Sequence, residues 1–153
     1  MLEVMGQQIG ERYQIIKPLA SGSFGETFLA QDTHIPDEPS CVVKQFKPDD
    51  ESHLEIAKGL FYKEAKILDK FGKHPQIPKL FAYFEEDKEF YLVQEFIDGD
   101  NLDNELNSGK KYSESDVKKL LIDVLEILTH VHGNNVIHRD IKPGNIMRRQ
   151  SGE

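Results

Sequence analysis

Five short stretches rich in hydrophobic residues occur in the first hundred residues of this 153-residue chain. Short runs of this kind are typical of β-strands, and turn-forming Gly, Pro and Asp residues separate them. We therefore predict five strands, over residues 12–20, 26–32, 41–47, 80–85 and 90–96. The first two strands should form one hairpin, and an acidic turn over 86–89 should join the last two.

Apolar residues three and four positions apart predict two long helices. The first covers 55–71; the second begins at a capping box formed by Ser113 and Asp116 and is stopped by Gly133. A shorter helix is expected near 102–106. The second long helix has an apolar face made of seven residues: Val117, Leu120, Leu121, Val124, Leu125, Leu128 and Val131.

The turn of the first predicted hairpin is rich in small residues and reads Leu-Ala-Ser-Gly-Ser-Phe-Gly-Glu-Thr over 19–27. Glycine has no Cβ, so the backbone N–H groups of such a turn can approach phosphate oxygens closely. A phosphate-binding loop is one interpretation, and a plain hairpin turn is an equally good one. The residues concerned are Ala20, Gly22, Ser23, Phe24, Gly25 and Thr27.

Lys44 interrupts the apolar strand over 41–47, and Glu64 lies within the apolar face of the first long helix. The residues three and four positions from Glu64 are all apolar, so no cation on the same helix can pair with it. A buried carboxylate must find a distant cation or lose its charge, and Lys44 is the natural candidate. The alternative is that Glu64 turns out to water and Lys44 faces the surface.

Residues 138–145 read His-Arg-Asp-Ile-Lys-Pro-Gly-Asn, which resembles the catalytic-loop signature of protein kinases. The 19–27 segment resembles the kinase glycine loop, with Ala20 in place of its first glycine and Thr27 in place of a valine. The strand with Lys44 and the helix with Glu64 follow in the kinase order. Over residues 12–149 the chain is identified as a member of the protein kinase superfamily, similar to bacterial kinases of the serine/threonine type.

This resemblance implies an α+β fold. A five-stranded antiparallel N-lobe with one long helix would be followed by the first helices and the catalytic loop of a C-lobe. The expected divisions are an N-terminal extension over 1–11, the N-lobe and hinge over 12–97, and a partial C-lobe over 98–153.

The resemblance also implies transfer of a phosphoryl group from ATP to Ser or Thr hydroxyls of a protein substrate. Asp140 would position the substrate hydroxyl, Lys142 would neutralise charge on the transferring group, and Asn145 would bind Mg²⁺. Lys44, held by Glu64, would contact the phosphates of ATP. The glycine-loop residues would cover the phosphates, and the adenine end of the site would be formed by Val42, Gln94, Glu95, Ile97 and Met147.

The 153 residues contain no Asp-Phe-Gly, the kinase motif whose aspartate also holds Mg²⁺. We therefore expect a kinase domain truncated before that motif, with negligible activity alone. The alternatives are a truncated pseudokinase that acts as a nucleotide-binding or regulatory module, and a folded remnant without activity. The apolar face of the 114–132 helix should be partly open, unless the helix packs back on its own chain. A partner, a second copy of the chain or a further segment of polypeptide could cover this face.

Charge and cysteine content exclude several other classes of protein. Acidic residues outnumber basic ones by 27 to 19 and the net charge is −8, which argues against a nucleic-acid or anionic-membrane binder. No stretch has the length of a membrane-spanning helix, and no secretory signal is visible. The single cysteine, Cys41, excludes an intrachain disulfide, disfavours structural zinc and suits a reducing compartment, so we expect a cytoplasmic protein.

Overall fold

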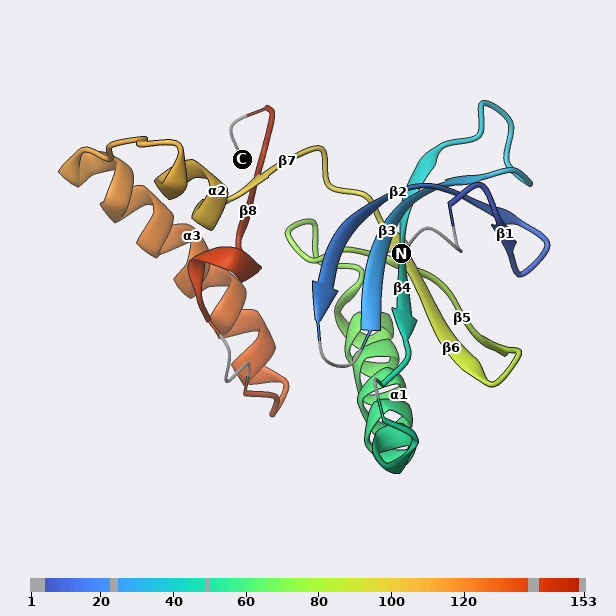
Figure 1. The fold of residues 1–153 in the computed structure, drawn as a ribbon. Coiled ribbons are helices and arrows are strands. Elements are labelled where there is room, and N and C mark those ends of the chain that lie inside the picture. Colours follow the sequence, from blue (N-terminus) through green and yellow to red (C-terminus); the bar gives the residue numbers. More distant parts are fainter. Residues whose placement is uncertain (1–4, 23–24, 49, 138–140, 152–153) are drawn as a thin grey trace. The chain divides into compact units, whose positions relative to one another are not determined.

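The computed structural model describes residues 5–22, 25–48, 50–137 and 141–151. The chain forms two compact units, unit 1 over Met1–Phe96 and unit 2 over Ile97–Glu153. Figure 1 labels the elements of both. The division between the units falls one residue before the lobe boundary expected from the sequence.

Unit 1 contains a six-stranded antiparallel sheet in the order β1-β2-β3-β4-β6-β5. Five of its strands correspond to those expected, and β1 is additional because a two-residue strand has no alternation to reveal it. It lies within the expected N-terminal extension and pairs with the start of β2. The strands are β1 (Gln8–Ile9), β2 (Tyr13–Gly22), β3 (Gly25–Asp32), β4 (Ser40–Phe46), β5 (Leu80–Glu86) and β6 (Glu89–Glu95).

A tight turn at Asp87 and Lys88 joins β5 to β6. Both residues have positive φ, 51° and 66°, which is the backbone of the two-residue turns that match the twist of a hairpin. The expected acidic turn over 86–89 is therefore shorter, and Glu86 and Glu89 pair with each other as the last residues of their strands.

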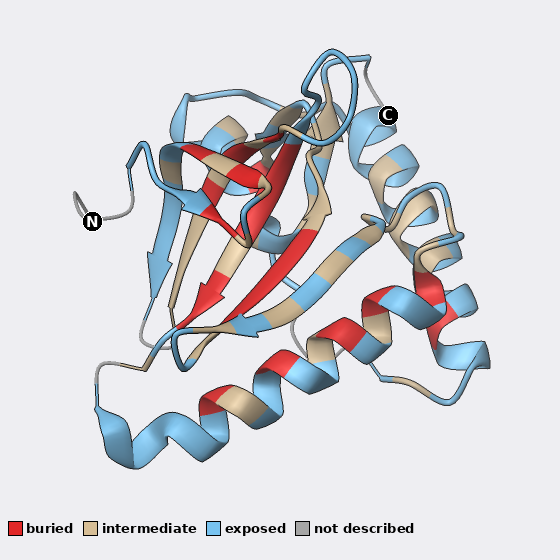
Figure 2. Cartoon of the chain, turned by 90° about the vertical axis from the view of Figure 1, so that its right-hand side faces the viewer, coloured by how far each residue is buried: buried red, intermediate tan, exposed pale blue. Residues whose placement is uncertain are grey.

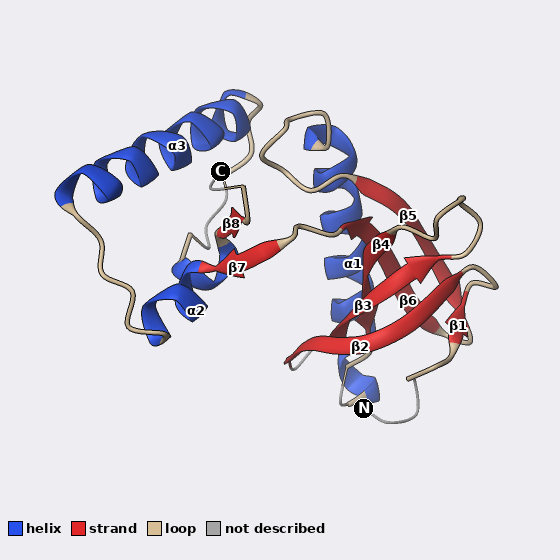
Figure 3. Ribbon diagram, turned by 90° about the horizontal axis from the view of Figure 1, so that it is seen from above, coloured by secondary structure: helices blue, strands red, loops and turns tan. Residues whose placement is uncertain are grey.

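The sheet buries apolar residues on both faces, because β4 and β6 carry consecutive apolar residues whose side chains point to opposite sides. One face carries the buried residues Ile9, Tyr13, Ile15, Phe28, Ala30, Cys41, Val43, Tyr91 and Val93. The other face is covered by α1 (Leu54–Phe71), which follows the short helix η1 (Glu51–His53) (Figures 1 and 3). Phe46, Phe90 and Leu92 of the sheet pack there against Phe61, Ala65 and Leu68 of the helix.

The buried side of α1 is a narrow stripe along the helix, shown in red in Figure 2. Its buried residues include Ala65, which the apolar pattern did not single out. Leu60, which the same spacing assigns to the buried face, is instead 39% exposed. Small residues such as Ala57 and Ala65 let the helix approach the sheet closely, and Phe61 and Phe71 are its largest buried side chains.

Unit 2 contains a two-stranded antiparallel ribbon of β7 (Gly99–Asn101) and β8 (Met147–Arg149), in which Asp100 pairs with Arg148. Arg148 and Arg149 therefore belong to a strand that was not among the five expected from the sequence. A backbone hydrogen-bonding partner 48 positions away, not local sequence, makes Arg148 extended. The helices of the unit are α2 (Leu102–Asn107), α3 (Glu114–Gly133) and η2 (Pro143–Asn145).

The capping box at the start of α3 is present: the Ser113 and Asp116 side chains each accept a hydrogen bond from the other residue's backbone N–H. The stop differs slightly from the expected one. Gly133 is the last helical residue, and Asn135, with φ 61°, takes the left-handed conformation that ends the turn.

Most of the apolar face of α3 is open, as Figure 2 shows by its blue and tan colours. Val117, Leu121 and Leu125 are 51%, 56% and 51% exposed, and Val131 alone in the helix is buried. Among the described residues, no helix has the length and apolarity needed to cross a membrane.

Candidate functional site

Lys44 of β4 and Glu64 of α1 form an ion pair inside unit 1. Lys44 lies opposite Leu92 of β6, and Phe46, two residues along β4, packs under α1, so alternation puts Lys44 on the face that the helix covers. Its ammonium donates a hydrogen bond to the Glu64 carboxylate, and the two side chains are 31% and 32% exposed. The carboxylate therefore has a cation from the sheet and does not simply turn out to water.

Within this pair, the Lys44 ammonium is a positive charge held in place by Glu64. An ammonium has three N–H donors, so Lys44 can bind an anionic oxygen while Glu64 holds its side chain in place. Because both side chains remain partly exposed, a ligand can reach the charge from solvent. The arrangement suits phosphate, whose oxygens accept charge-assisted hydrogen bonds.

The ends of β2 and β3 carry the glycine loop, with Ala20 opposite Thr27 and Gly22 opposite Gly25. Gly25 has φ 147°, and a Cβ there would lie only 1.8 Å from the carbonyl oxygen of Gln45 on β4. The fold itself therefore requires Gly25. Among the described residues, no atom lies within 4 Å of a Cβ built at Gly22, so their packing does not require that glycine and leaves space beside it.

Three of the predicted adenine-site residues lie on the neighbouring strands β4 and β6, and a fourth begins unit 2. Val42 is buried on β4 and pairs with the half-buried Gln94 of β6. Glu95 ends β6, where its N–H donates to the Lys79 carbonyl at 2.8 Å. Ile97 is the first residue of unit 2 and is half-buried.

In unit 2, three predicted site residues follow one another closely in the chain, and all are exposed. Lys142 precedes η2, Asn145 ends η2, and the Asn145 N–H donates to the Lys142 carbonyl at 3.0 Å. Met147 begins β8 and pairs with Asn101 of β7. The ribbon therefore fixes the backbone that leads away from the catalytic-loop segment.

Asp140, Ser23 and Phe24 fall outside the described residues, so their predicted roles stay predictions. Within the described ranges, no three His, Cys, Asp or Glu side chains gather as a metal-binding group. The predicted Mg²⁺ contact rests on Asn145, whose amide oxygen is of the hard-donor type that Mg²⁺ prefers.

Sequence reasoning missed a charged pair that closes the β2–β3 hairpin at the end opposite the glycine loop. Arg12 donates from Nε and Nη2 to the two carboxylate oxygens of Asp32, at 2.7 and 2.8 Å. The Asp32 side chain is only 5% exposed, and the hydrogen bonds from Arg12 hold its pKa below the ordinary value. Single charges on separate strands leave no periodic signal, so only the register of the hairpin reveals the pair.

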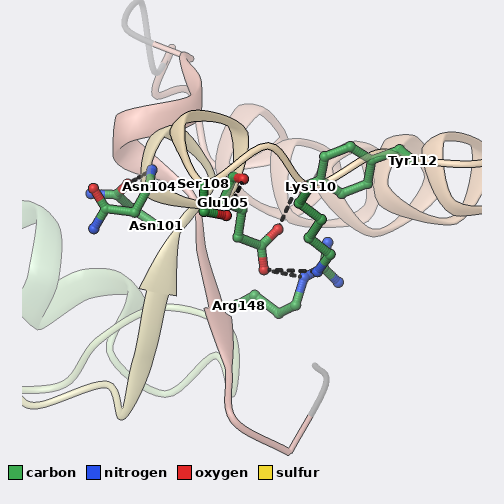
Figure 4. A network of polar contacts seen from close by, with 7 residues as sticks. All are labelled: Asn101, Asn104, Glu105, Ser108, Lys110, Tyr112 and Arg148. Atoms are coloured by element: carbon green, nitrogen blue, oxygen red, sulfur yellow. Dashed lines mark hydrogen bonds and ion pairs between the residues drawn. The ribbon is translucent and has the colours of Figure 1, made fainter.

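A second network, around Glu105 of α2, was missed for the same reason. Its carboxylate accepts hydrogen bonds from Arg148 Nε at 2.9 Å, from Lys110 Nζ at 3.2 Å and from the Tyr112 hydroxyl. Figure 4 shows Lys110 and Arg148 reaching this carboxylate. Together, the hydrogen bonds from Tyr112, Lys110 and Arg148 lower the pKa of Glu105.

A curled antiparallel sheet, a single helix that brings a carboxylate to a strand lysine, and a following catalytic-loop sequence are the features of a protein kinase domain. The model of the protein kinase domain family matches residues 13–153, and the chain belongs to this family.

Its similarities to individual proteins point the same way. The chain is 46% identical to serine/threonine-protein kinase B of Synechocystis sp. over 148 residues, which cover 95% of this chain and 26% of that protein. It is 45% identical to serine/threonine-protein kinase PknA of Nostoc sp., with the same coverages. The chain thus spans about a quarter of the length of these relatives.

A solved structure, the apo form of PpkA-294, has the same fold. The TM-score is 0.83 at 22% sequence identity, over 96% of this chain and 57% of that one. This likeness concerns the fold alone.

Proposed function

We propose that this chain is the nucleotide-binding portion of a serine/threonine protein kinase, which transfers the γ-phosphoryl group of ATP to Ser or Thr hydroxyls of protein substrates. The ion pair between Lys44 of β4 and Glu64 of α1 carries the proposal. Glu64 holds the Lys44 ammonium in place, and this positive charge suits the phosphates of ATP. The names of the Synechocystis and Nostoc relatives support the choice of acceptor.

In this proposal, each residue has a distinct task toward ATP and Mg²⁺. Lys44 binds the α- and β-phosphates, and the open space at Gly22 admits phosphate oxygens to the backbone. Asp140 orients the substrate hydroxyl, Lys142 offsets charge on the transferring group, and Asn145 holds Mg²⁺. The metal ion, when bound, supplies positive charge next to the phosphates.

The adenine ring is proposed to bind through backbone groups of Glu95 and Ile97 and through the side chains of Val42 and Met147. Gln94 would limit the depth of the pocket. Support comes from Val42 and Gln94, which are direct neighbours across β4 and β6, so that one pair of strands sets both positions. The glycine-loop residues Ala20, Ser23, Phe24, Gly25 and Thr27 complete the proposed site.

By itself, the chain is proposed to transfer phosphate negligibly. None of its residues forms an Asp-Phe-Gly motif, and losing one electrostatic contributor of this kind commonly costs on the order of a hundred- to a thousand-fold in rate. Robust phosphorylation of a generic protein substrate by the purified chain would contradict this. The runner-up function, a pseudokinase module that binds nucleotide and acts through contacts, shares the ATP site and lacks the transfer step.

Calorimetric titration of ATP into the chain, once with Mg²⁺ and once with EDTA, tests the proposal. We expect binding in both conditions, with little dependence on Mg²⁺ because the metal site is incomplete. Strong Mg²⁺ dependence would show that another carboxylate completes the metal site, and catalysis by the chain alone would then be expected. An absence of binding in either condition would overturn the proposed nucleotide site.

Two further proposals concern the surroundings of the chain. The exposed apolar face of α3 is proposed to be covered by further polypeptide, either from the same protein or from a partner chain. The proposed compartment is the cytoplasm, supported by the free Cys41 thiol, whose pKa burial raises to about 11. The net charge of −8 supports a protein substrate over a nucleic acid.

A further inference from the structure

The Glu105 network ties together three segments of unit 2 (Figure 4). Glu105 belongs to α2, Lys110 and Tyr112 belong to the connection between α2 and α3, and Arg148 is the middle residue of β8. One carboxylate therefore holds a strand and a loop to the same helix. Its side chain is only 11% exposed, and that of Arg148 is 28% exposed.

The segment held through Arg148 is weakly supported by its backbone alone. β8 has three residues and pairs with β7 in a two-stranded ribbon, and isolated two-stranded ribbons are marginally stable in water. Two further backbone hydrogen bonds flank it, from Leu102 N to Ile146 O and from Gln150 N to Asp98 O, both at 2.9 Å. The Glu105–Arg148 pair adds a side-chain contact at the centre of the strand.

Alternation along β8 separates this contact from the side chain proposed to meet adenine. Successive side chains of a strand point to opposite faces, so Met147 and Arg148 lie on opposite sides of the ribbon. Asn145, proposed to hold Mg²⁺, lies three positions before Arg148. Glu105 can thus fix the position of β8 from the face opposite Met147, without touching a nucleotide.

We propose that Glu105 is a positioning residue for nucleotide binding: through Arg148 it fixes β8, and with it Met147 and Asn145. The inference rests on the proposed function, since it assigns β8 to the ATP site. A positioning residue acts through another group, so its removal lowers ATP affinity only as far as β8 becomes free to move.

A double-mutant cycle on the whole chain tests this proposal, with ATP as the titrated ligand. We expect Glu105→Ala and Arg148→Ala each to weaken ATP binding about five-fold and the double variant to weaken it no further, because the two side chains act as one unit. Arg148→Lys, which keeps the charge and a donor, should retain most of the affinity. Additive losses in the double variant, or unchanged affinity in Glu105→Ala, would overturn the proposal.

Lys118→Ala is the matched control, because it breaks another ion pair of unit 2, between Lys118 and Glu114 on the exposed surface of α3. We expect its ATP affinity to equal that of the unchanged chain. A loss equal to that of Glu105→Ala would mean that any weakening of unit 2 lowers affinity, which contradicts a specific role for Glu105.

Amide hydrogen exchange in the absence of nucleotide separates this inference from the proposed function. We expect Glu105→Ala to speed exchange at least ten-fold in the β7–β8 ribbon and to leave α3 and unit 1 unchanged. If this occurs while the unchanged chain binds no ATP, the proposed function fails and the tether on β8 stands. Unchanged exchange in the ribbon, or equal acceleration throughout unit 2, would overturn the positioning role whatever the outcome with ATP.

Discussion

At the scale of single residues, the chemistry of this domain depends on charges held by partners from distant segments. Glu64 has only apolar neighbours on its own helix, and its cation comes from β4, twenty positions earlier in the chain. Asp32 is similarly satisfied by Arg12. A cation from another segment offsets part of the cost of removing such a carboxylate from water. Each of these pairs therefore links two segments of the chain and holds a charged side chain in a defined position.

Replacement of Lys44 by methionine should abolish measurable ATP affinity while the fold is retained, because the charge that binds phosphate is lost. Methionine keeps the length and apolar contacts of the side chain and removes the charge. Glu64 is 32% exposed, so water can solvate it and the free energy of unfolding should change by only about 1 kcal/mol or less. ATP titration and urea unfolding measure the two quantities.

Lys17→Met is the control for this substitution, because Lys17 is an exposed lysine on β2. It should bind ATP as the unchanged chain does. Equal affinity in Lys44→Met and Lys17→Met would remove Lys44 from the proposed site.

Asp32→Asn should destabilise the chain at neutral pH by roughly 1–3 kcal/mol, because it removes the charge that Arg12 binds. The pKa of Asp32 is held below its ordinary value in the folded state, so its stabilising effect is present above that value. The effect is lost as the pH falls through the folded-state pKa. The stability difference between the two proteins should therefore be constant from about pH 5 to 8 and shrink below about pH 4.

Urea unfolding over this pH range makes the measurement. Asp37→Asn, at an exposed position whose φ of 67° asparagine also tolerates, should differ little from the unchanged chain at any pH. A gap for Asp32→Asn that persisted at the lowest pH would show that packing, and not charge, explains the loss.

At the scale of elements, the two glycines of the glycine loop differ in the reason for their presence, although the sequence shows them as one motif. Gly22 and Gly25 stand opposite each other at the ends of β2 and β3. The Gln45 carbonyl of β4 occupies the space of a Cβ at Gly25, whereas no atom of the described residues occupies that space at Gly22. Strand packing therefore explains Gly25 and does not explain Gly22, whose proposed task is to admit phosphate oxygens.

Gly25→Ala should cost roughly 3 kcal/mol or more of unfolding free energy, since both the φ of 147° and the approach of Gln45 oppose a Cβ. Gly22→Ala is the matched control and should change stability by less than about 1 kcal/mol, because it meets open space. Thermal or urea unfolding measures the loss of unfolding free energy in each variant. Similar losses at both positions would mean that β4 moves aside for a side chain at Gly25.

The elements themselves were largely predictable from the sequence. Short hydrophobic runs bounded by turn residues located five strands of the sheet within a residue or two, and Ser113 with Asp116 located the start of α3. The exceptions have physical reasons: β1 is too short for a pattern, and β8 is extended because β7 pairs with it. Helical spacing assigns both Leu60 and Phe61 to the buried face, and only the packing of α1 on the sheet shows that Leu60 is exposed.

At the scale of the whole chain, the two units differ in how far their apolar side chains are buried. Unit 1 has apolar clusters on both faces of its sheet. In unit 2, α3 keeps Val117, Leu121 and Leu125 more than half exposed. An apolar helix face of this kind is usually an interface or a site of aggregation. The chain spans about a quarter of the relatives it matches, and we propose that further polypeptide covers this face.

Changing Leu121 and Leu125 together to glutamine should lower self-association and the binding of a hydrophobic dye. The free energy of unfolding should change by less than about 0.5 kcal/mol per site, because both side chains are exposed. Val131→Ala, at the buried end of the same helix, should instead cost roughly 1–3 kcal/mol. Sedimentation, dye fluorescence and urea unfolding provide the comparison; loss of the fold in the double variant would show that α3 is covered within the chain itself.

The sequence by itself determined the order of strands and helices, the family and a hypothesis for the partner of Glu64. These depend on periodicity, capping and short motifs, which act over a few residues and remain visible along the chain. Tertiary structure decided which side chains meet. Arg148 lies 43 positions from Glu105, and the sequence around each residue contains no pattern that predicts their contact. Contacts of this kind depend on how the chain turns between elements, and a local pattern does not contain that information.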